Sequence, residues 1–333
     1  MPFYSPDPGM GQRLEQLVRA LEVDGRPGLA QRLSITWLRR LPGTPARSPI
    51  GLGANLQPQR FWALPWLGAG WHGASRRYPA SVVKLVYLVA AEAWLQDDRL
   101  PDSTELRQAL AAMIRDSSND ATGLVVDLLS GTTSGPQLPP DRLAVWQRQR
   151  QLMNQWLLQL GWPELEGWNA CQKTWGDGPY GRERQSYGEQ NQHRNRLGSD
   201  GVARLLLAVI GSAIVSPPAC ARMRELLSRS LDAASRAEDP ENQVDGFLGE
   251  GLPPGARLWS KAGWMSQARH DAAYVEWPAT QGAADPVVAG ETGGPAGAEQ
   301  QLNASLLVVF SEGKQCAQDN SLLPEIARRL LQE

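Results

Sequence analysis

The chain has 333 residues, of which 42% are hydrophobic, so it can bury a sizeable core as one large domain or as two interleaved lobes. Its formal net charge is only -2 and no basic patch is interleaved with aromatic residues, which argues against binding to nucleic acid or to a membrane surface. The few cysteines and histidines form no C-x-x-C pair and no metal-ligand spacing, so we expect no disulfide framework, no metal and no other cofactor; they are Cys171, Cys220, Cys316, His72, His193 and His270.

Hydrophobic periodicity predicts both strands and helices along the chain. A helix around 12–18 precedes a strand at 33–38, and a second strand is predicted to start at 61–64. Helices are then predicted at 81–96, 103–115, 120–129, 143–160, 199–212 and 217–230, followed by strands at 257–264, 270–277 and 304–310 and a last helix at 320–331. The segment 278–300 is rich in Gly, Ala and Pro, which is typical of a flexible loop between two strands.

The first residues of the sequence carry no pattern of a secretory signal. They lead into a charged helix without an apolar h-region, and no later segment has the length of a membrane span. We therefore expect a cytoplasmic location, or a periplasmic one if a leader is missing from this sequence. Composition gives no prediction of the oligomeric state.

The most informative local pattern is an S-x-x-K pair at the start of the apolar helix 81–96, formed by Ser81 and Lys84. Only four of the 33 basic residues are lysine, and a lysine, unlike an arginine, can lose its proton when buried and act as a base. Residues three apart share one helix face, so the amine of Lys84 is expected to reach the hydroxyl of Ser81 and activate it as a nucleophile. An ordinary core helix can carry the same pair by chance, so other motifs must decide.

Two further motifs follow in a fixed order. Ser117 and Asn119 form the only S-x-N of the chain, between two predicted helices, and Lys261 and Gly263 form the only K-x-G, on a predicted strand. The order S-x-x-K, S-x-N, K-x-G is the signature of class A β-lactamases and penicillin-binding proteins. The chain therefore resembles the serine β-lactamase and DD-peptidase superfamily.

The resemblance implies a role for each matching residue. Ser81 would be the acylated nucleophile, Lys84 its general base, and Ser117 the relay that returns a proton to the leaving nitrogen. Asn119 would hydrogen-bond both Lys84 and the side-chain amide of the substrate. Lys261 would attract a substrate carboxylate and disfavour protonation of Lys84.

The backbone around the third motif would complete the site. By the resemblance, the N–H groups of Ser81 and Trp264 form an oxyanion hole, and Gly263 lets the substrate lie along the strand edge. This chain has Ser118 where the family has an aspartate and Ala262 where it has a hydroxyl residue, and both changes remove polar contacts. Arg269, or His270 beside it, is the expected replacement donor for a substrate carboxylate.

The glutamate that activates the deacylating water in class A enzymes has no clear counterpart, because the E-x-x-L-N pattern is absent. Glu183 is the nearest substitute by spacing and Glu189 a weaker one, and both also fit the description of charged surface residues. The span between the first two motifs is short, so one wall of the usual cleft is expected to be missing. If neither glutamate activates a water, the acyl-enzyme should be long-lived.

These observations predict an α/β (α+β) fold of the β-lactamase/transpeptidase type, with an antiparallel sheet, flanking terminal helices and an all-helical lobe. We expect a discontinuous sheet lobe at 1–78 and 254–333, and a helical lobe at 79–253 with an insertion at 131–180 that caps the cleft. The predicted function is a serine hydrolase that opens β-lactam or related amide bonds of small molecules. A DD-peptidase or penicillin-binding protein, a cytosolic amidase, glutaminase or esterase, and a non-catalytic binding relative remain alternatives.

Overall fold

The structure is a computed structural model that describes residues 2–40, 61–62, 66–279 and 302–332. A seven-stranded sheet runs through the described residues in the order β1-β3-β2-β7-β6-β5-β4. All neighbouring pairs are antiparallel except β1 and β3. The strands are β1 (Ser5–Pro6), β2 (Leu33–Arg40), β3 (Trp66–Trp71), β4 (Ser228–Arg229), β5 (Arg257–Met265), β6 (Ala268–Pro278) and β7 (Leu302–Glu312).

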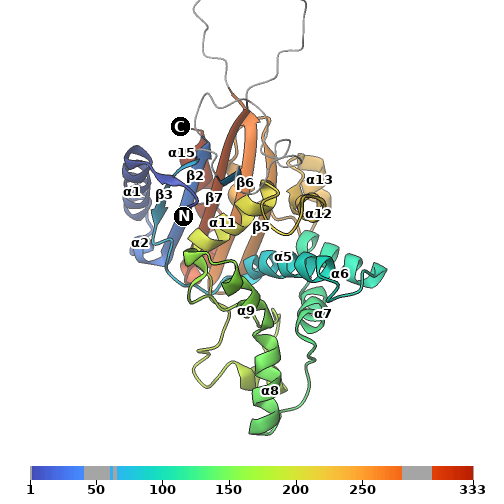
Figure 1. Ribbon diagram of the computed structural model, residues 1–333. Helices are drawn as coiled ribbons and strands as arrows, with labels where there is room; N and C mark the ends of the chain where they lie inside the picture. The colour runs from blue at the N-terminus through green and yellow to red at the C-terminus, as the bar shows by residue number, and fades with distance from the viewer. Residues whose placement is uncertain (1, 41–60, 63–65, 280–301, 333) are drawn as a thin grey trace, which may run out of the picture.

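The sheet is covered on both faces, which explains why its central strands are buried at nearly every position. On β7, Leu306 and Val308 join the core on one face, whereas Leu307 and Val309 join the core on the other, as the two-residue period of a strand requires. The terminal helices α1 (Pro8–Val23) and α15 (Leu322–Leu331) pack on one face (Figure 1). Smaller elements near this face are α2 (Leu29–Arg32), α14 (Lys314–Gln318) and the 3-10 helix η3 (Leu248–Gly251).

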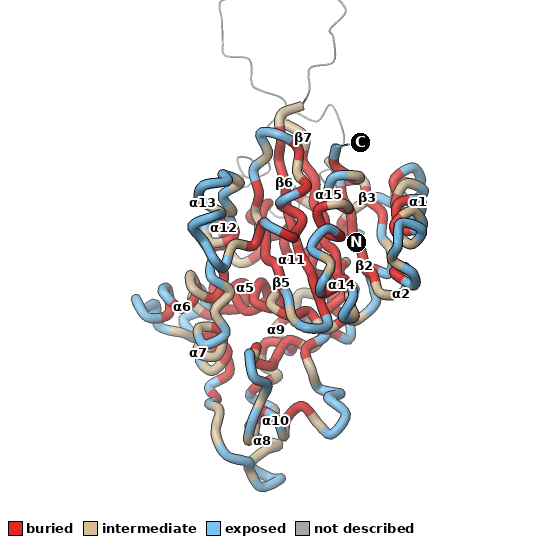
Figure 2. Tube along the Cα trace, turned by 180° about the vertical axis from the view of Figure 1, so that it is seen from behind, coloured by how far each residue is buried: buried red, intermediate tan, exposed pale blue. Residues whose placement is uncertain are grey.

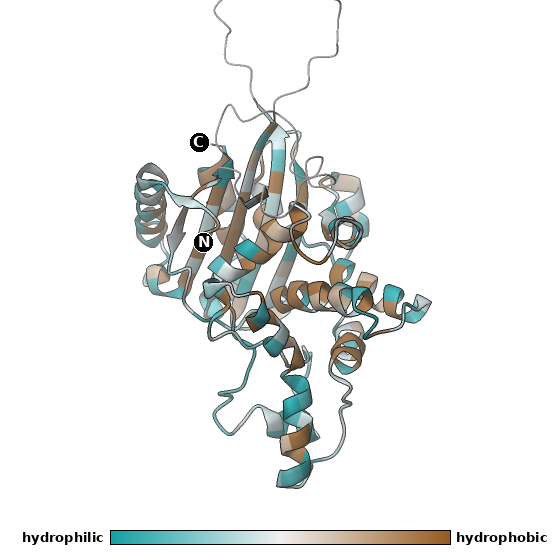
Figure 3. Ribbon diagram, viewed as in Figure 1, coloured by the Kyte–Doolittle hydropathy of each residue, from teal (hydrophilic) through white to brown (hydrophobic). Residues whose placement is uncertain are grey.

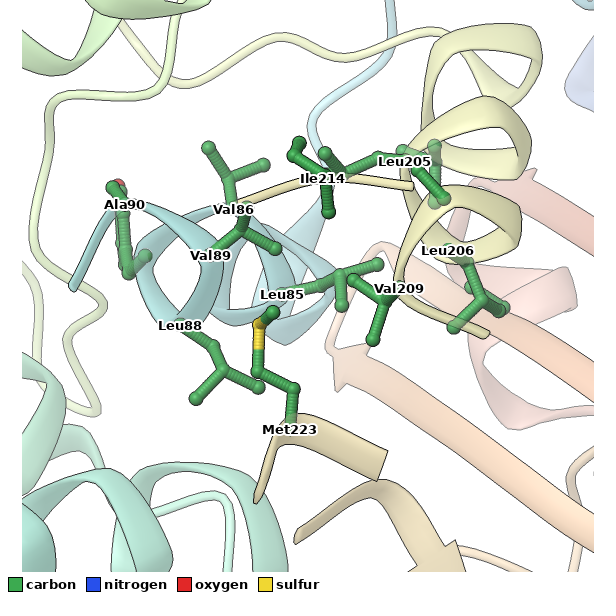
Figure 4. Packing of buried hydrophobic residues seen from close by; sticks show 14 of the residues in the cluster. Leu85, Val86, Leu88, Val89, Ala90, Leu205, Leu206, Val209, Ile214 and Met223 are labelled. Carbon is green, nitrogen blue, oxygen red and sulfur yellow. The ribbon is translucent and has the colours of Figure 1, made fainter. Parts of the chain in front are cut away.

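The opposite face carries the larger core. The helices on this side are α5 (Val83–Gln96), α6 (Thr104–Arg115), α7 (Asn119–Ser130), α11 (Ser199–Ile210), α12 (Pro217–Leu227) and the exposed α13 (Ala233–Glu238). Helix α5 is buried from Val83 to Trp94, and Figure 3 shows it hydrophobic along most of its length. Its side chains meet those of α11 and α12 in the packing seen in Figure 4, which includes Leu85, Leu88, Val209 and Met223. A helix enclosed in this way is a rigid support for the residues at its start.

The segment predicted as an insertion projects away from the sheet (Figure 1). It contains α8 (Pro140–Arg150), α9 (Leu152–Gln159) and the 3-10 helix η2 (Pro163–Leu165), and α10 (Gly181–Ser186) follows it. Figure 2 shows buried stretches within this projection, so it has internal packing of its own. The proposed lobe boundaries at 78/79 and 253/254 remain a prediction.

The predicted fold class is confirmed, and most elements lie where periodicity put them. The strand predicted to start at 61–64 is an exception, because Phe61 and Trp62 are helical and the strand begins at Trp66. Phe61 is fully buried in the helical core, so its apolar run reflects burial and not strand pairing. The single helix predicted at 143–160 is divided into α8 and α9, and the helix predicted at 217–230 ends at Leu227. The loop predicted at 278–300 lies almost wholly outside the described residues.

Among the helices of the described residues, none combines the length and hydrophobicity needed to cross a bilayer. The three cysteines are buried free thiols. The described residues also contain no group of three or more His, Cys, Asp or Glu side chains arranged to hold a metal ion.

Candidate active site

Ser81 lies in a strained turn that leads into α5. It is the middle residue of the 3-10 helix η1 (Ala80–Val82), and Ala80 before it has a φ of 45°. A non-glycine residue with positive φ persists only where its surroundings enforce it, and such strain is concentrated at functional sites. The buried ring of His270 helps to enforce it, because Nε2 donates to the carbonyl of Tyr78 at 2.8 Å while Nδ1 accepts from the N–H of Ser311 at 3.0 Å.

This arrangement gives His270 a structural position and not the one expected from the sequence. Burial lowers the pKa of His270 to about 4, so the ring is neutral at ordinary pH. Both ring nitrogens are already used within the protein. The expectation that His270 could donate to a substrate carboxylate is therefore wrong, and the residue fixes the turn before Ser81 instead.

Lys84 follows one turn later and is fully buried. Its amine donates to the carbonyl oxygen of Ser117, to Oδ1 of Asn119 at 2.9 Å and to Oγ of Ser117 at 3.2 Å. Burial lowers the pKa of Lys84 to about 7, and the negative charge of Glu241 acts in the opposite direction. About half of these amines are therefore neutral at pH 7, which is the state that a general base requires.

The S-x-N motif forms the turn between α6 and α7. Ser117 has a φ of 53°, and Asn119 is the first residue of α7. Ser118 is the N-cap of that helix, because its Oγ accepts from the N–H of Ala121 at 3.2 Å. The serine in place of the family's aspartate therefore retains a polar contact, since both residue types cap helices through a side-chain oxygen.

Lys261 reaches the same turn from β5. Its amine donates to Oγ of Ser117 at 3.1 Å, to the carbonyl of Ala262 at 2.7 Å and to Oε1 of Gln243. Burial, followed by the positive charge of Lys84, lowers the pKa of Lys261 well below its usual value. The hydroxyl oxygen of Ser117 accepts from both amines, so its own proton is left to donate elsewhere.

The K-x-G glycine is required for β5 to approach the nucleophile. A Cβ added at Gly263 would lie 2.9 Å from the backbone N of Ser81 and 3.0 Å from the carbonyl oxygen of Pro79. Any other residue at this position would push the strand away from the turn. The absence of a side chain at Gly263 therefore lets the edge of β5 lie close to the N–H groups at the start of α5.

The hydroxyl of Ser81 is not bonded to Lys84 in this state. Among the described residues no hydrogen bond joins the two side chains, because the three N–H groups of Lys84 point to the turn between α6 and α7. Deprotonation of the amine removes one donor and creates a lone pair. A neutral Lys84 can therefore give up one of its present contacts and turn toward the half-buried Ser81.

Two cavities meet at Ser81. The larger is a cleft of about 740 Å³. Its walls include Ser117, Asn119, Gly263, Trp264 and Arg269, and three carboxylates, Glu241, Asp245 and Glu250, also line it. A smaller cavity of about 170 Å³ shares Ser81, Asn119 and Trp264 with the cleft and is otherwise lined by aromatic and loop residues.

The expected carboxylate-binding role of Arg269 receives limited support. Arg269 lines the cleft, but its guanidinium donates to the carbonyls of Ala317 and Gly246 at 3.1 and 3.2 Å and to Oδ1 of Asn320 at 2.6 Å. These contacts occupy most of its five N–H donors. Ala262 offers no hydroxyl, so this cleft has fewer groups for an anionic substrate than the resemblance implies.

Glu183 lies apart from the other expected site residues. It is fully buried, forms an ion pair with Arg150, accepts a hydrogen bond from Ser134 at 2.8 Å, and lies 3.9 Å from the amine of Lys173. It lines neither cavity, and Glu189 is exposed and also lines neither. The structure therefore gives neither glutamate a contact with Ser81, and the expected positioning of a water by Glu183 has no geometric support.

Two features of this site carried no sequence signal. Gln243 binds Lys261 and lies in a polar loop without a motif, so only its burial identifies it. From the end of the predicted insertion, Thr174, Trp175, Gly176, Gly178 and Pro179 line the small cavity, and the expectation that this segment caps the cleft stays a prediction. Glu241 was likewise unmarked, although its charge affects Lys84.

The comparisons with known proteins identify a family and a fold. The model of the Beta-lactamase enzyme family matches residues 79–289, which is more than half of the chain. No curated protein matches the sequence. Among solved structures, PBP-A has 16% sequence identity and a TM-score of 0.56, with 100% of this chain and 97% of that chain covered.

Further solved structures have similar scores. A mutant of PBP-A in an acyl-enzyme complex with penicillin G has 16% identity and a TM-score of 0.58, with 100% of this chain and 98% of that chain covered. A beta lactamase from Xanthomonas campestris has 14% identity and a TM-score of 0.55, with 97% and 98% covered. At these identities the likeness shows the fold, and the family match carries the assignment. The chain belongs to the beta-lactamase enzyme family.

Proposed function

We propose that this protein is a serine hydrolase that opens β-lactam or related amide bonds through an acyl intermediate on Ser81. The observation that carries this proposal is the meeting of two buried amines, Lys84 and Lys261, on the hydroxyl oxygen of Ser117 beside that serine. Among the described residues neither amine has a carboxylate within ion-pair distance. Buried amines without counter-ions are costly in a purely structural role, and depressed amine pKa values are typical of functional sites.

In the proposed acylation step, Oγ of Ser81 attacks the carbonyl carbon and its proton passes to the neutral amine of Lys84. The carbonyl oxygen becomes an oxyanion, which the N–H groups of Ser81 and Trp264 stabilise. The C–N bond then breaks, and the leaving nitrogen takes the proton of the Ser117 hydroxyl. The protonated amine of Lys84 returns a proton to Ser117 Oγ, which leaves an acyl-serine and a neutral lysine.

In the second half-reaction, water adds to the acyl carbon, the ester bond to Ser81 breaks and the acid is released. The ion pair of Glu183 with Arg150 supports slow deacylation, because this carboxylate is already neutralised by a buried cation. A penicillin-binding protein, which forms the adduct and retains it, is therefore the second candidate function.

A chromogenic cephalosporin assay combined with intact-mass measurement tests the proposal. Turnover supports a hydrolase, and a stable adduct of one drug molecule without turnover supports the penicillin-binding type. A Ser81→Ala variant should show neither result. A Lys84→Arg variant keeps the charge but cannot act as a base, so we expect acylation to slow by about 10²-fold to 10⁴-fold. Undiminished acylation of either variant would contradict the proposal.

A further inference from the structure

The leaving group of the proposed reaction extends into the large cleft. Ser117, the proposed proton donor to the leaving nitrogen, lines this cleft of about 740 Å³ and does not line the smaller cavity. The sequence resemblance implies a substrate carboxylate on this side. In this chain its donors would stand at Lys261, at position 262 and at Arg269, so these three positions decide whether a carboxylate can bind.

The first two positions offer no donor to a ligand in the cleft. Lys261 is fully buried and is not among the residues that line the cleft. Its amine donates to Ser117, to Gln243 and to the carbonyl of Ala262, which uses the three N–H groups of an ammonium. Ala262 has only a methyl group where a hydroxyl would serve a carboxylate.

Arg269 lines the cleft, but its guanidinium is enclosed. The residue is 7% exposed, and the guanidinium carbon lies 5.1 Å from the ring centroid of Phe247 and 5.7 Å from that of Trp264. Hydrogen bonds to two backbone carbonyls and to Asn320 use all but one of its five N–H donors. A bidentate hold on a carboxylate needs two donors, so the group cannot provide one in this arrangement.

Trp264 is fixed over this cation by a shared acceptor. The indole N–H donates to the carbonyl of Ala317 at 2.8 Å, and Nε and Nη2 of Arg269 donate to the same carbonyl at 3.2 and 3.1 Å. Trp264 lines the cleft and is 59% exposed, so a substrate in the cleft meets the indole before it meets the guanidinium. The face of an indole attracts cations and not anions.

The other charged groups of the cleft are acidic. Glu241, Asp245 and Glu250 line it. Asp245 pairs with Arg236, whereas Glu241 and Glu250 have no cation within ion-pair distance in the described part of the chain. The charge of Glu241 extends to the reacting groups, because it raises the pKa of Lys84 against the larger effect of burial. The potential in the cleft therefore favours positive charge.

We propose that the cleft accepts substrates with an uncharged or cationic leaving group and rejects those with a carboxylate beside the scissile bond, and that Trp264 sets this specificity by covering Arg269. A carboxylate in the cleft would lose part of its hydration and find no pair of donors to replace it. A cation meets an indole face and carboxylates. This inference rests on the proposed function and narrows its substrate class to amides whose amine portion lacks a carboxylate.

The test uses the full chain and three thioesters of phenylacetic acid, which differ only in the leaving thiol. The thiol is 3-mercaptopropionate (anionic), N-acetylcysteamine (uncharged) or thiocholine (cationic). Acylation joins Oγ of Ser81 to the acyl carbon and breaks the C–S bond, and the thiol leaves with the proton of Ser117. Released thiol reports the rate and intact mass the adduct, with Ser81→Ala as the blank. Each rate is divided by the rate of base hydrolysis of the same ester, which corrects for intrinsic reactivity.

We expect the uncharged ester to acylate Ser81 at least about tenfold faster than the anionic ester, because like charges in the cleft oppose the latter. The cationic ester should react at least as fast as the uncharged one. Trp264→Ala retains the backbone N–H and uncovers Arg269, so it should raise the relative rate of the anionic ester by about twofold to fivefold, the contribution of an exposed ion pair. Tyr180→Ala is the matched control, because it removes an equally exposed ring (58%) that lines neither cavity, and it should keep the wild-type ratios.

A second variant tests the charge without disturbing the cover. The carboxylate of Glu250 accepts from the N–H of Gly246 at 2.6 Å, a contact that an amide oxygen can retain. Glu250→Gln should therefore raise the rate of the anionic ester relative to the cationic one by about twofold to fivefold. Glu238→Gln removes an exposed carboxylate that does not line the cleft and should leave this ratio unchanged.

The outcomes separate the two proposals. If no thioester gives an adduct on Ser81, the proposed function fails and the inference fails with it. If the anionic ester acylates Ser81 as fast as the uncharged one, or faster, the function stands and the specificity is overturned. A cationic ester slower than the uncharged one overturns the electrostatic part, and unchanged ratios in folded Trp264→Ala overturn the role of the indole. The wild-type comparison decides the substrate class even if that variant fails to fold.

Discussion

The pH dependence of acylation is the most direct test of the role of Lys84. Its pKa is lowered from 10.5 to about 7 by burial, so the amine is about half neutral at pH 7. An amine with the unperturbed pKa would be neutral in only about one molecule in 3,000 at this pH. In the proposed mechanism the neutral form is the active base, and it gains population as the pH rises.

The acylation rate constant should therefore increase with pH up to about 7 and level off above it. From about pH 5 to pH 7 the neutral fraction grows about fiftyfold, and the rate should follow it. The measurement is the second-order rate of adduct formation on Ser81, followed by intact mass, with far-UV circular dichroism to verify folding at each pH. A rate that stays constant over this interval in folded protein would refute the assignment of Lys84 as the base.

A charge variant sharpens this test. Glu241 lines the cleft, and its negative charge raises the pKa of Lys84 against the larger effect of burial. In Glu241→Gln, the part of the rate–pH curve that rises with pH (the rising limb) should therefore move to lower pH, because loss of the negative charge further disfavours the protonated amine of Lys84. Glu238→Gln removes an exposed carboxylate that does not line the cleft and should leave the limb in place. A limb that moves to higher pH in Glu241→Gln, or moves equally in both variants, would contradict this electrostatic account.

Two further substitutions test the structural reasoning. Glu183→Gln should leave acylation unchanged but lower the free energy of unfolding by about 3–5 kcal/mol, because it leaves the buried Arg150 without its main counter-ion; urea unfolding measures this. Slower deacylation with unchanged stability would instead identify Glu183 as the base for water. Gly263→Ala should slow acylation by about a hundredfold, since its Cβ would lie 2.9 Å from the backbone N of Ser81 and displace the strand. Gly11→Ala, whose Cβ would meet no atom within 4 Å, is the control and should keep full activity.

The fold was predictable because its elements have strong local patterns. The helix that begins after Ser81 is apolar at most positions and buried from Val83 to Trp94, and β7 has the apolar run of a strand covered on both faces. The three motifs also lie where chain topology brings separate elements together, so their order in sequence carried information on the site. Phe61 shows the limit of this approach, because a short apolar run does not distinguish a strand from a buried helical turn.

Glu183 shows a different limit. Its spacing from the other motifs agreed with a base for deacylation, but spacing does not report which cation lies next to a carboxylate. Arg150, about thirty residues earlier in the chain and within the projecting segment, pairs with it. We predicted that segment as an insertion relative to the family, and its sequence contained no pattern from which the partner could be inferred. Long-range ion pairs of this kind are decided by tertiary packing.

Gln243 explains how the site tolerates two lysines so close together. Its Oε1 accepts from the amine of Lys261 and from the N–H of Ala262, and its Nε2 donates to the carbonyls of Ile114 and Arg115 at 3.1 and 2.8 Å. The amide thus joins β5 to the end of α6, one residue before the turn that contains Ser117. A glutamate at this position could join the same elements, but its negative charge would favour the protonated form of Lys261. The positive charge of Lys261 would then disfavour protonation of the neighbouring Lys84. A neutral amide holds the amine without fixing its charge, and the proposed mechanism, in which protons pass through the Ser117 hydroxyl, requires this freedom.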